Sequence, residues 1–258
     1  MFRDKSAAIT SDAYLYGKAI RSPEVDKKYL AELEKESGFD RIRFVNVYGE
    51  SFASDGKAAD VAGRDYFQNG IKGRSGTTVV MKSNFDSAKL IGFYAPVWFH
   101  GKICGVMVGF LEKQTVSGIL STNFSGYPVY TLIVGEDYSA IGYYQAAGKS
   151  SADSLEPVMN YINESDRKRV WNAVTDRREV SFFFMGSSGQ SAGSILPING
   201  TPWSLIQFCL SEAVQELTEE VNRDEWFTSS VWNRSVVFRY PASLCREKRG
   251  SLGPGKEK

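Results

Sequence analysis

Two apolar runs joined by a tight turn constrain the fold of this chain more than any other feature. They lie inside the segment from Ser54 to Leu111 and meet at His100-Gly101. Strand-like runs with such a short turn between them predict an antiparallel hairpin. Ahead of the runs, an arginine and two aromatic residues, Arg64, Tyr66 and Phe67, stand at the start of a predicted short helix. The whole segment is interpreted as one wall of a ligand pocket.

The composition indicates a globular protein with a substantial core. The chain has 258 residues, of which 42% are hydrophobic, and its formal net charge is +1. This balance gives no reason to expect a nucleic-acid partner, and neither does any long run of Lys and Arg. No apolar segment approaches the ~20 residues that span a bilayer, and the N-terminus lacks the apolar stretch of a secretory signal. As written, the chain predicts a soluble protein without an export signal.

The reactive side chains argue against an enzyme. The three cysteines, Cys104, Cys209 and Cys245, form no CxxC pair, so we expect neither a metal site nor a cofactor. Cys104 and Cys209 lie in strand-like runs and are interpreted as core residues. The only histidine, His100, is placed in a hairpin turn rather than in the role of a general base. The glycine-rich loop from 186 to 189 precedes a strand instead of a helix, which predicts a turn and not a phosphate site.

Periodicity and turn residues predict an α+β chain in which each half contains helices and an antiparallel sheet. Two helices are expected before Gly38, the second starting at Ser22-Pro23-Glu24, and a strand is expected from Phe39 to Tyr48. Later strands are predicted over 129–134, 140–144, 180–185, 193–198 and 203–210, and later helices over 112–120, 155–162, 165–175 and 211–222. Ser165 is the predicted N-cap of its helix. The basic tail from Trp226 onward is expected to be disordered.

Arg64 allows two interpretations from its chemistry alone. A guanidinium next to aromatic rings can clamp a ligand carboxylate bidentately while the rings enclose the rest of the ligand. Alternatively, Arg64 pairs with Asp60 or Asp86 and locks the loop in place. The residues themselves leave both interpretations open.

Several blocks in this order resemble the double Cache (dCache) sensor domains of bacterial receptors. The blocks are Arg64-Asp65-Tyr66-Phe67, the pair Gly70 and Gly73, the run Phe93-Tyr94-Ala95-Pro96-Val97, the turn His100-Gly101 and the run Gly105-Val106-Met107-Val108-Gly109. The resemblance covers about Phe39 to Leu120 well, and it extends to Asn222 by architecture only. The RDYF and FYAPV blocks are most similar to those of sensors attached to diguanylate cyclases.

The resemblance implies a long N-terminal helix followed by two PAS-like modules, each an antiparallel sheet with flanking helices. It places the helical segment at 1–38, a membrane-distal module with the ligand pocket at 39–125, a membrane-proximal module at 126–222 and a tail at 223–258. In intact receptors these modules lie outside the cytoplasmic membrane, between two transmembrane helices of the same chain. Ligand binding shifts a helix, and this shift drives a cytoplasmic output domain. Because this sequence lacks both transmembrane helices, the resemblance predicts a fragment or a truncated gene.

The resemblance also implies a set of ligand-binding residues. Arg64 matches the arginine that holds the ligand carboxylate in amino-acid-binding members, whereas Tyr66 and Phe67 replace their usual Trp and Tyr. Phe110 replaces a final Asp, so a ligand ammonium group loses a partner. The predicted binding residues are Arg64, Tyr66, Phe67, Phe85, Asp86 and Tyr94. The predicted ligand is small and polar or anionic, either a carboxylate or an amino-acid-like molecule.

The leading hypothesis is therefore a ligand-sensing module without catalysis of its own. One alternative is a Cache-like structural module that has lost ligand binding and serves in dimerisation. Another is an enzyme of unrecognised type. A homodimer through the N-terminal helix is compatible with the sensing module and with the structural module.

Overall fold

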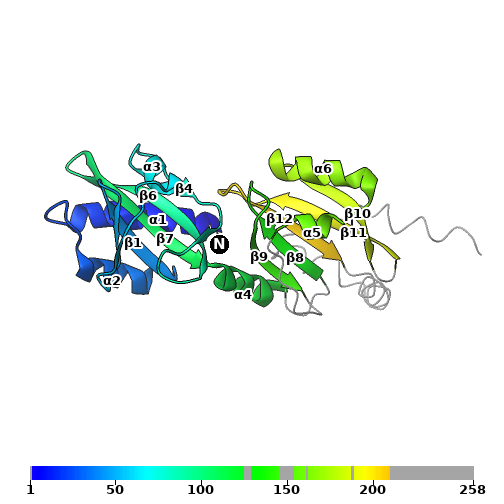
Figure 1. Ribbon diagram of the computed structural model, residues 1–258, viewed down its shortest axis with the longest axis horizontal. Coiled ribbons are helices and arrows are strands. Elements are labelled where there is room, and N and C mark those ends of the chain that lie inside the picture. Colours follow the sequence, from blue (N-terminus) through cyan, green and yellow to red (C-terminus); the bar gives the residue numbers. More distant parts are fainter. Residues whose placement is uncertain (1, 125–128, 146–153, 161, 187–188, 210–258) are drawn as a thin grey trace, which may run out of the picture. The chain divides into compact units, whose positions relative to one another are not determined.

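The computed structural model describes residues 2–124, 129–145, 154–160, 162–186 and 189–209. Within them the chain is α+β, as predicted, with an N-terminal helix and two antiparallel sheets that carry flanking helices (Figure 1). No helix in this part of the chain is both long and apolar enough to cross a membrane. The predicted helix at 211–222, the basic tail and Cys245 lie outside the described residues.

The first sheet is built from strands between residues 41 and 112. Its order is β3-β2-β1-β7-β6-β4, and β5 also pairs with β6. The strands are β1 (Arg41–Asn46), β2 (Glu50–Phe52), β3 (Ala58–Asp60), β4 (Gly76–Thr77), β5 (Met81–Lys82), β6 (Lys89–Phe99) and β7 (Lys102–Glu112). The long strands β6 and β7 are central, and each of them is buried along most of its length.

The predicted hairpin is formed by β6 and β7. Its turn is His100-Gly101, with φ values of 46° and 77°. Two left-handed residues in a two-residue loop match the right-handed twist of the flanking strands. Glycine adopts this conformation without strain, and histidine is among the residues that tolerate it. The structure thus confirms the predicted turn, and it leaves the histidine exposed.

The two faces of the first sheet are covered by different elements. Helix α1 (Phe2–Ala19) packs on β6 and β7, and α2 (Lys27–Glu36) packs on β1. Helix α3 (Asp65–Gly70) also contacts β6 and β7, but its Tyr66 and Phe67 join the apolar cluster that contains Val45, whereas α1 joins the cluster that contains Phe44. Because neighbouring strand residues point to opposite faces, β1 divides its side chains between the two layers.

The second sheet is built from strands between residues 129 and 209, in the order β10-β11-β12-β8-β9. The strands are β8 (Val129–Val134), β9 (Ala140–Gln145), β10 (Val180–Gly186), β11 (Gly189–Pro197) and β12 (Ser204–Cys209). Three helices accompany it: α4 (Lys113–Phe124), α5 (Glu156–Met159) and α6 (Glu164–Thr175). Helix α6 packs on β10 and β11, and α4 packs on β9. The division of modules predicted at residue 125 falls between the two sheets and stays a prediction.

Two predicted helix starts are wrong. Helix α2 begins at Lys27 and not at Ser22-Pro23-Glu24, because the Asp26 side chain accepts a hydrogen bond from the Tyr29 N–H at 3.0 Å and so acts as the N-cap. Helix α6 begins at Glu164 with Asn163 as its N-cap, and not with Ser165. In both cases the N-cap position is occupied by a polar residue within four positions of the predicted one.

The N-cap of α2 provides a stability test. Replacing Asp26 with Ala removes the side-chain acceptor at Tyr29, and we expect it to lower the free energy of unfolding by about 1 kcal/mol. The matched control is Asn163→Ala, because Asn163 occupies the same position in α6 without a side-chain cap hydrogen bond. Urea unfolding of both variants checks the difference, and an equal loss in the two would contradict the assignment of Asp26 as the cap.

Candidate ligand-binding site

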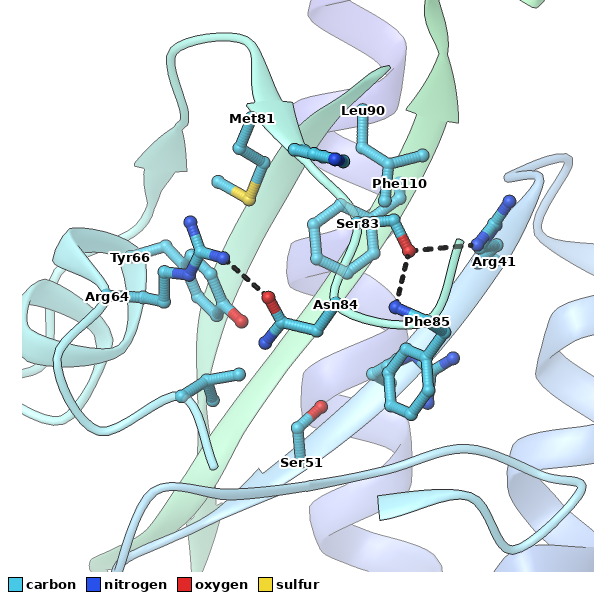
Figure 2. A pocket seen from close by; sticks show the side chains of 13 residues that line it. Arg41, Ser51, Arg64, Tyr66, Met81, Ser83, Asn84, Phe85, Leu90 and Phe110 are labelled. Atoms are coloured by element: carbon cyan, nitrogen blue, oxygen red, sulfur yellow. Dashed lines mark hydrogen bonds between the residues drawn. The ribbon is translucent and has the colours of Figure 1, made fainter. Parts of the chain in front are cut away.

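A pocket lies on the α3 face of the first sheet, where β1, β2, β6 and β7 meet the entry of α3 and the segment before β6 (Figure 2). The segment 83–88, here called the pocket loop, connects β5 to β6 and carries residues that lie over the pocket. The residues that line the pocket are Arg41, Arg43, Ser51, Val61, Arg64, Tyr66, Met81, Lys82, Ser83, Asn84, Phe85, Leu90 and Phe110.

The charge of this lining is one-sided. Four of the lining residues are basic, namely Arg41, Arg43, Arg64 and Lys82, and none of the lining residues is acidic. Arginine presents a rigid fork of donors that matches a carboxylate. The pocket therefore favours an anionic group.

Arg64 stands at the N-cap position of α3, in extended conformation. Its Nη2 donates a hydrogen bond of 2.7 Å to the Asn84 side-chain oxygen (Figure 2). Among the described residues Arg64 makes no ion pair: Asp60 instead accepts from the Ala62 N–H, and Asp86 pairs with another arginine. The Arg64 guanidinium thus contacts a neutral amide instead of a carboxylate.

Arg41 plays a different part, because it ties the pocket loop to the sheet. Its Nη1 lies 2.8 Å from the Asp86 carboxylate, and its Nη2 pairs with Glu112. The Ala88 N–H and Arg41 hold the pKa of Asp86 below its usual range. Arg41 is therefore neutralised by the protein itself, unlike Arg64.

Tyr66 and Phe110 form the apolar floor of the pocket. Their rings meet edge to face with centroids 6.1 Å apart, and Tyr66 also lies 6.4 Å from the Tyr94 ring. Burial raises the pKa of Tyr66 to about 12, although Arg64 and Arg43 act in the opposite direction. The Tyr66 hydroxyl is thus protonated at neutral pH and can donate to an anion. Phe110, which the resemblance places where an Asp is usual, does face the same pocket as Arg64.

The free space inside the pocket is small. It amounts to about 30 Å³, enough for about two water molecules, whereas pockets for small organic ligands usually measure roughly 300–1,000 Å³. Asn84 and Phe85 occupy the mouth, and both are exposed on their outer side. A ligand can therefore enter only if the pocket loop moves outward.

The structure brings only part of the predicted site together. Arg64, Tyr66 and Phe85 line one pocket, whereas Phe67 and Tyr94 are buried beside it and do not line it. Asp86 faces Arg41 outside the lining. Sequence reasoning missed Arg41 and Arg43, because polar residues that alternate with Ile42 and Phe44 in a strand normally mark a solvent-facing side.

Comparison with known proteins supports the fold. No protein-family model and no curated protein matches the sequence significantly. Solved structures do match it, among them the extracellular domain of a protein assigned as a histidine kinase, mmHK1S-Z3, with 8% identity, a TM-score of 0.61 and coverage of 85% of this chain and 91% of that one.

Two chemoreceptor domains are similar to it as well. The sensory domain of Campylobacter jejuni Tlp3 with isoleucine bound has 10% identity, a TM-score of 0.58 and coverage of 81% of this chain and 85% of that one. The ligand-binding domain of Pseudomonas fluorescens CtaA in complex with L-alanine has 16% identity, a TM-score of 0.59 and coverage of 82% and 90%. The fold is thus that of extracellular sensory domains of receptors, which confirms the Cache-like, PAS-like architecture that the resemblance implied.

Proposed function

We propose that this chain is the ligand-sensing part of a bacterial signalling receptor and that the pocket on its first sheet binds a small carboxylate. The observation that carries the proposal is the lining with four basic and no acidic residues. Arg64 holds the carboxylate, and Tyr66 donates to it from the floor. Phe85 of the pocket loop borders the ligand.

The fold supports a sensing role. The solved structures named above are sensory or extracellular receptor domains, and two of them hold an amino acid, isoleucine in one and L-alanine in the other. Here the strands that line the pocket on one face support α1 on the other, so a displacement of β6 or β7 by a ligand reaches that helix. In an intact receptor such a chain faces the outside of the cytoplasmic membrane. A diguanylate cyclase as the output domain stays a prediction from the sequence.

Phe110 argues for a carboxylate over an amino acid. An amino acid bound through Arg64 needs an acceptor for its ammonium group, and an unpaired buried ammonium is costly. Phe110 and Leu90 offer none, and no carboxylate lines the pocket. A ligand without an ammonium group avoids this cost.

The test is a thermal-shift screen of carboxylates, amino acids, amines and nucleobases against the wild type and Arg64→Met. We expect carboxylates to raise the melting temperature of the wild type, because a ligand at 100 times its Kd adds about 2.7 kcal/mol of stability. Arg64→Met should weaken binding by about tenfold or more. Arg21→Met is the matched control, since Arg21 is exposed and does not line the pocket. A carboxylate whose effect is unchanged in Arg64→Met would exclude this anchor.

A second candidate function is a structural, dimer-forming module without a ligand. The small free volume of the pocket favours it, and so do the exposed Tyr14 and Leu15 on α1. In that case no compound stabilises the protein, and sedimentation shows a dimer that Leu15→Glu dissociates. If any carboxylate stabilises the wild type and the effect is lost in Arg64→Met, the protein has the sensing role.

A further inference from the structure

Arg43 is the most unusual charged residue of the first sheet. It lies on β1 next to the pocket, its exposed fraction is only 8%, and it lines the same pocket as Arg64. Its Nη1 has no hydrogen-bond partner among the described residues. Asp55 and Glu34 act on Arg43 through their charge only, and Asp55 is paired with Lys57. A buried charge without a partner is costly and calls for an explanation.

The pocket loop contacts Arg43 through an aromatic ring only. The Phe85 ring lies 4.2 Å from the guanidinium carbon, a cation–π contact, and Phe85 itself is 39% exposed. Such a contact offsets part of the cost of burial but provides no acceptor for the free N–H. Burial accordingly lowers the pKa of Arg43, although a guanidinium remains protonated in proteins.

Three successive residues of the pocket loop each contact a different arginine. Asn84 bonds to Arg64, Phe85 covers Arg43, and Asp86 pairs with Arg41. Only the last contact brings a negative charge. The closed loop therefore pairs one arginine with a carboxylate and places a neutral group, which an anion can replace, against each of the other two. Asp55 and Glu34 act on Arg43 as well, but neither belongs to the loop or to the lining of the pocket.

We propose that the ligand carries two carboxylates, one bound by Arg64 and the other by Arg43, and that it enters by displacing Asn84 and Phe85. This inference rests on the proposed carboxylate-sensing function and names the ligand class. Arg64, at the start of α3, and Arg43, on β1, line the same pocket, and a short-chain dicarboxylate can contact two arginines of one pocket. The Arg41–Asp86 pair anchors the far end of the loop while its middle opens.

The experiment is titration calorimetry on the full chain with carboxylates matched in carbon number, succinate against butyrate and glutarate against valerate. We expect the wild type to bind the dicarboxylate about tenfold more tightly or better, the effect of one charge-assisted hydrogen-bonded group. Arg43→Met should lower dicarboxylate affinity to about the monocarboxylate level, and its effect on monocarboxylate affinity should be much smaller. Arg43→Lys, which keeps the charge, should restore part of the preference, and it replaces the Met variant if that one fails to fold.

The outcomes separate the two proposals. The assignment of Arg43 is overturned if the wild type binds the dicarboxylate and the matched monocarboxylate with equal affinity. It is also overturned if the preference for the dicarboxylate survives Arg43→Met. Either result leaves the carboxylate sensor in place. If the folded wild type binds no carboxylate of either kind, the proposed function itself fails. The control variant Arg21→Met, exposed and outside the lining, should match the wild type for every compound.

Discussion

Replacing Phe44 with alanine should lower the free energy of unfolding by about 3–5 kcal/mol, the usual cost of removing a fully buried aromatic side chain. Phe44 lies on β1 with no exposed surface, and its ring centroid is 5.2 Å from that of Tyr16 on α1. The substitution leaves a cavity between the sheet and the helix, and the close-packed surroundings can fill it only in part.

Urea unfolding followed by circular dichroism measures this loss as a lower midpoint at an unchanged slope. Val47→Ala is the control, because Val47 is exposed beyond the end of the same strand, and its loss should stay within about 0.5 kcal/mol. A cost below about 1.5 kcal/mol for Phe44→Ala would mean that α1 does not pack on this sheet as described.

The second large effect is expected at Gly105, on β7. A Cβ at this position would lie 2.6 Å from two carbons of the Phe44 ring and well inside 3.0 Å of the Val45 carbonyl oxygen. The carbonyl belongs to the backbone of the paired strand β1 and cannot turn away. We therefore expect Gly105→Ala to cost about 3 kcal/mol, the upper end of the usual range for overpacking.

Gly63→Ala is the matched control for Gly105→Ala. An added Cβ at Gly63 meets no atom within 4 Å, so the variant should be neutral or more stable by about 0.4–1 kcal/mol through its stiffer unfolded chain. Gly105→Ala should lower the unfolding midpoint, whereas Gly63→Ala should leave it unchanged or raise it. Similar stability of both variants would show that β1 and β7 do not approach each other this closely at Gly105.

The sequence predicted the parts of the fold that depend on local signals. The hairpin of β6 and β7 follows from two apolar runs and a His-Gly turn, and both turn residues have the positive φ that such a turn requires. The start of α2 depended on which of two nearby polar residues caps the helix, and there the local signal was ambiguous. Asp26 is the cap.

The candidate site was predictable only in part, because its members come from distant segments. Arg64 and Tyr66 belong to one recognisable block, and Phe85 shares their pocket. Arg43 escaped notice because a polar residue that alternates with Ile42 and Phe44 normally marks a solvent-facing side. Here that side is covered by the pocket loop, about forty residues further along the chain. Only the tertiary arrangement shows that this arginine is buried.

The pocket and the N-terminal helix share the strands between them. Val106 and Val108 of β7 belong to the apolar cluster of the pocket face, and Met107 belongs to the cluster of the α1 face. A ligand that displaces the pocket loop acts on strands that also support α1. This arrangement gives a physical route from binding to a helix displacement.

The most direct test of the central claim is a crystal structure of the protein grown with glutarate. The account predicts one carboxylate within about 3 Å of the Arg64 guanidinium, the other at Arg43, and Asn84 and Phe85 moved outward with the Arg41–Asp86 pair intact. Glutarate bound elsewhere, or at this pocket without contact to Arg64, would contradict the account.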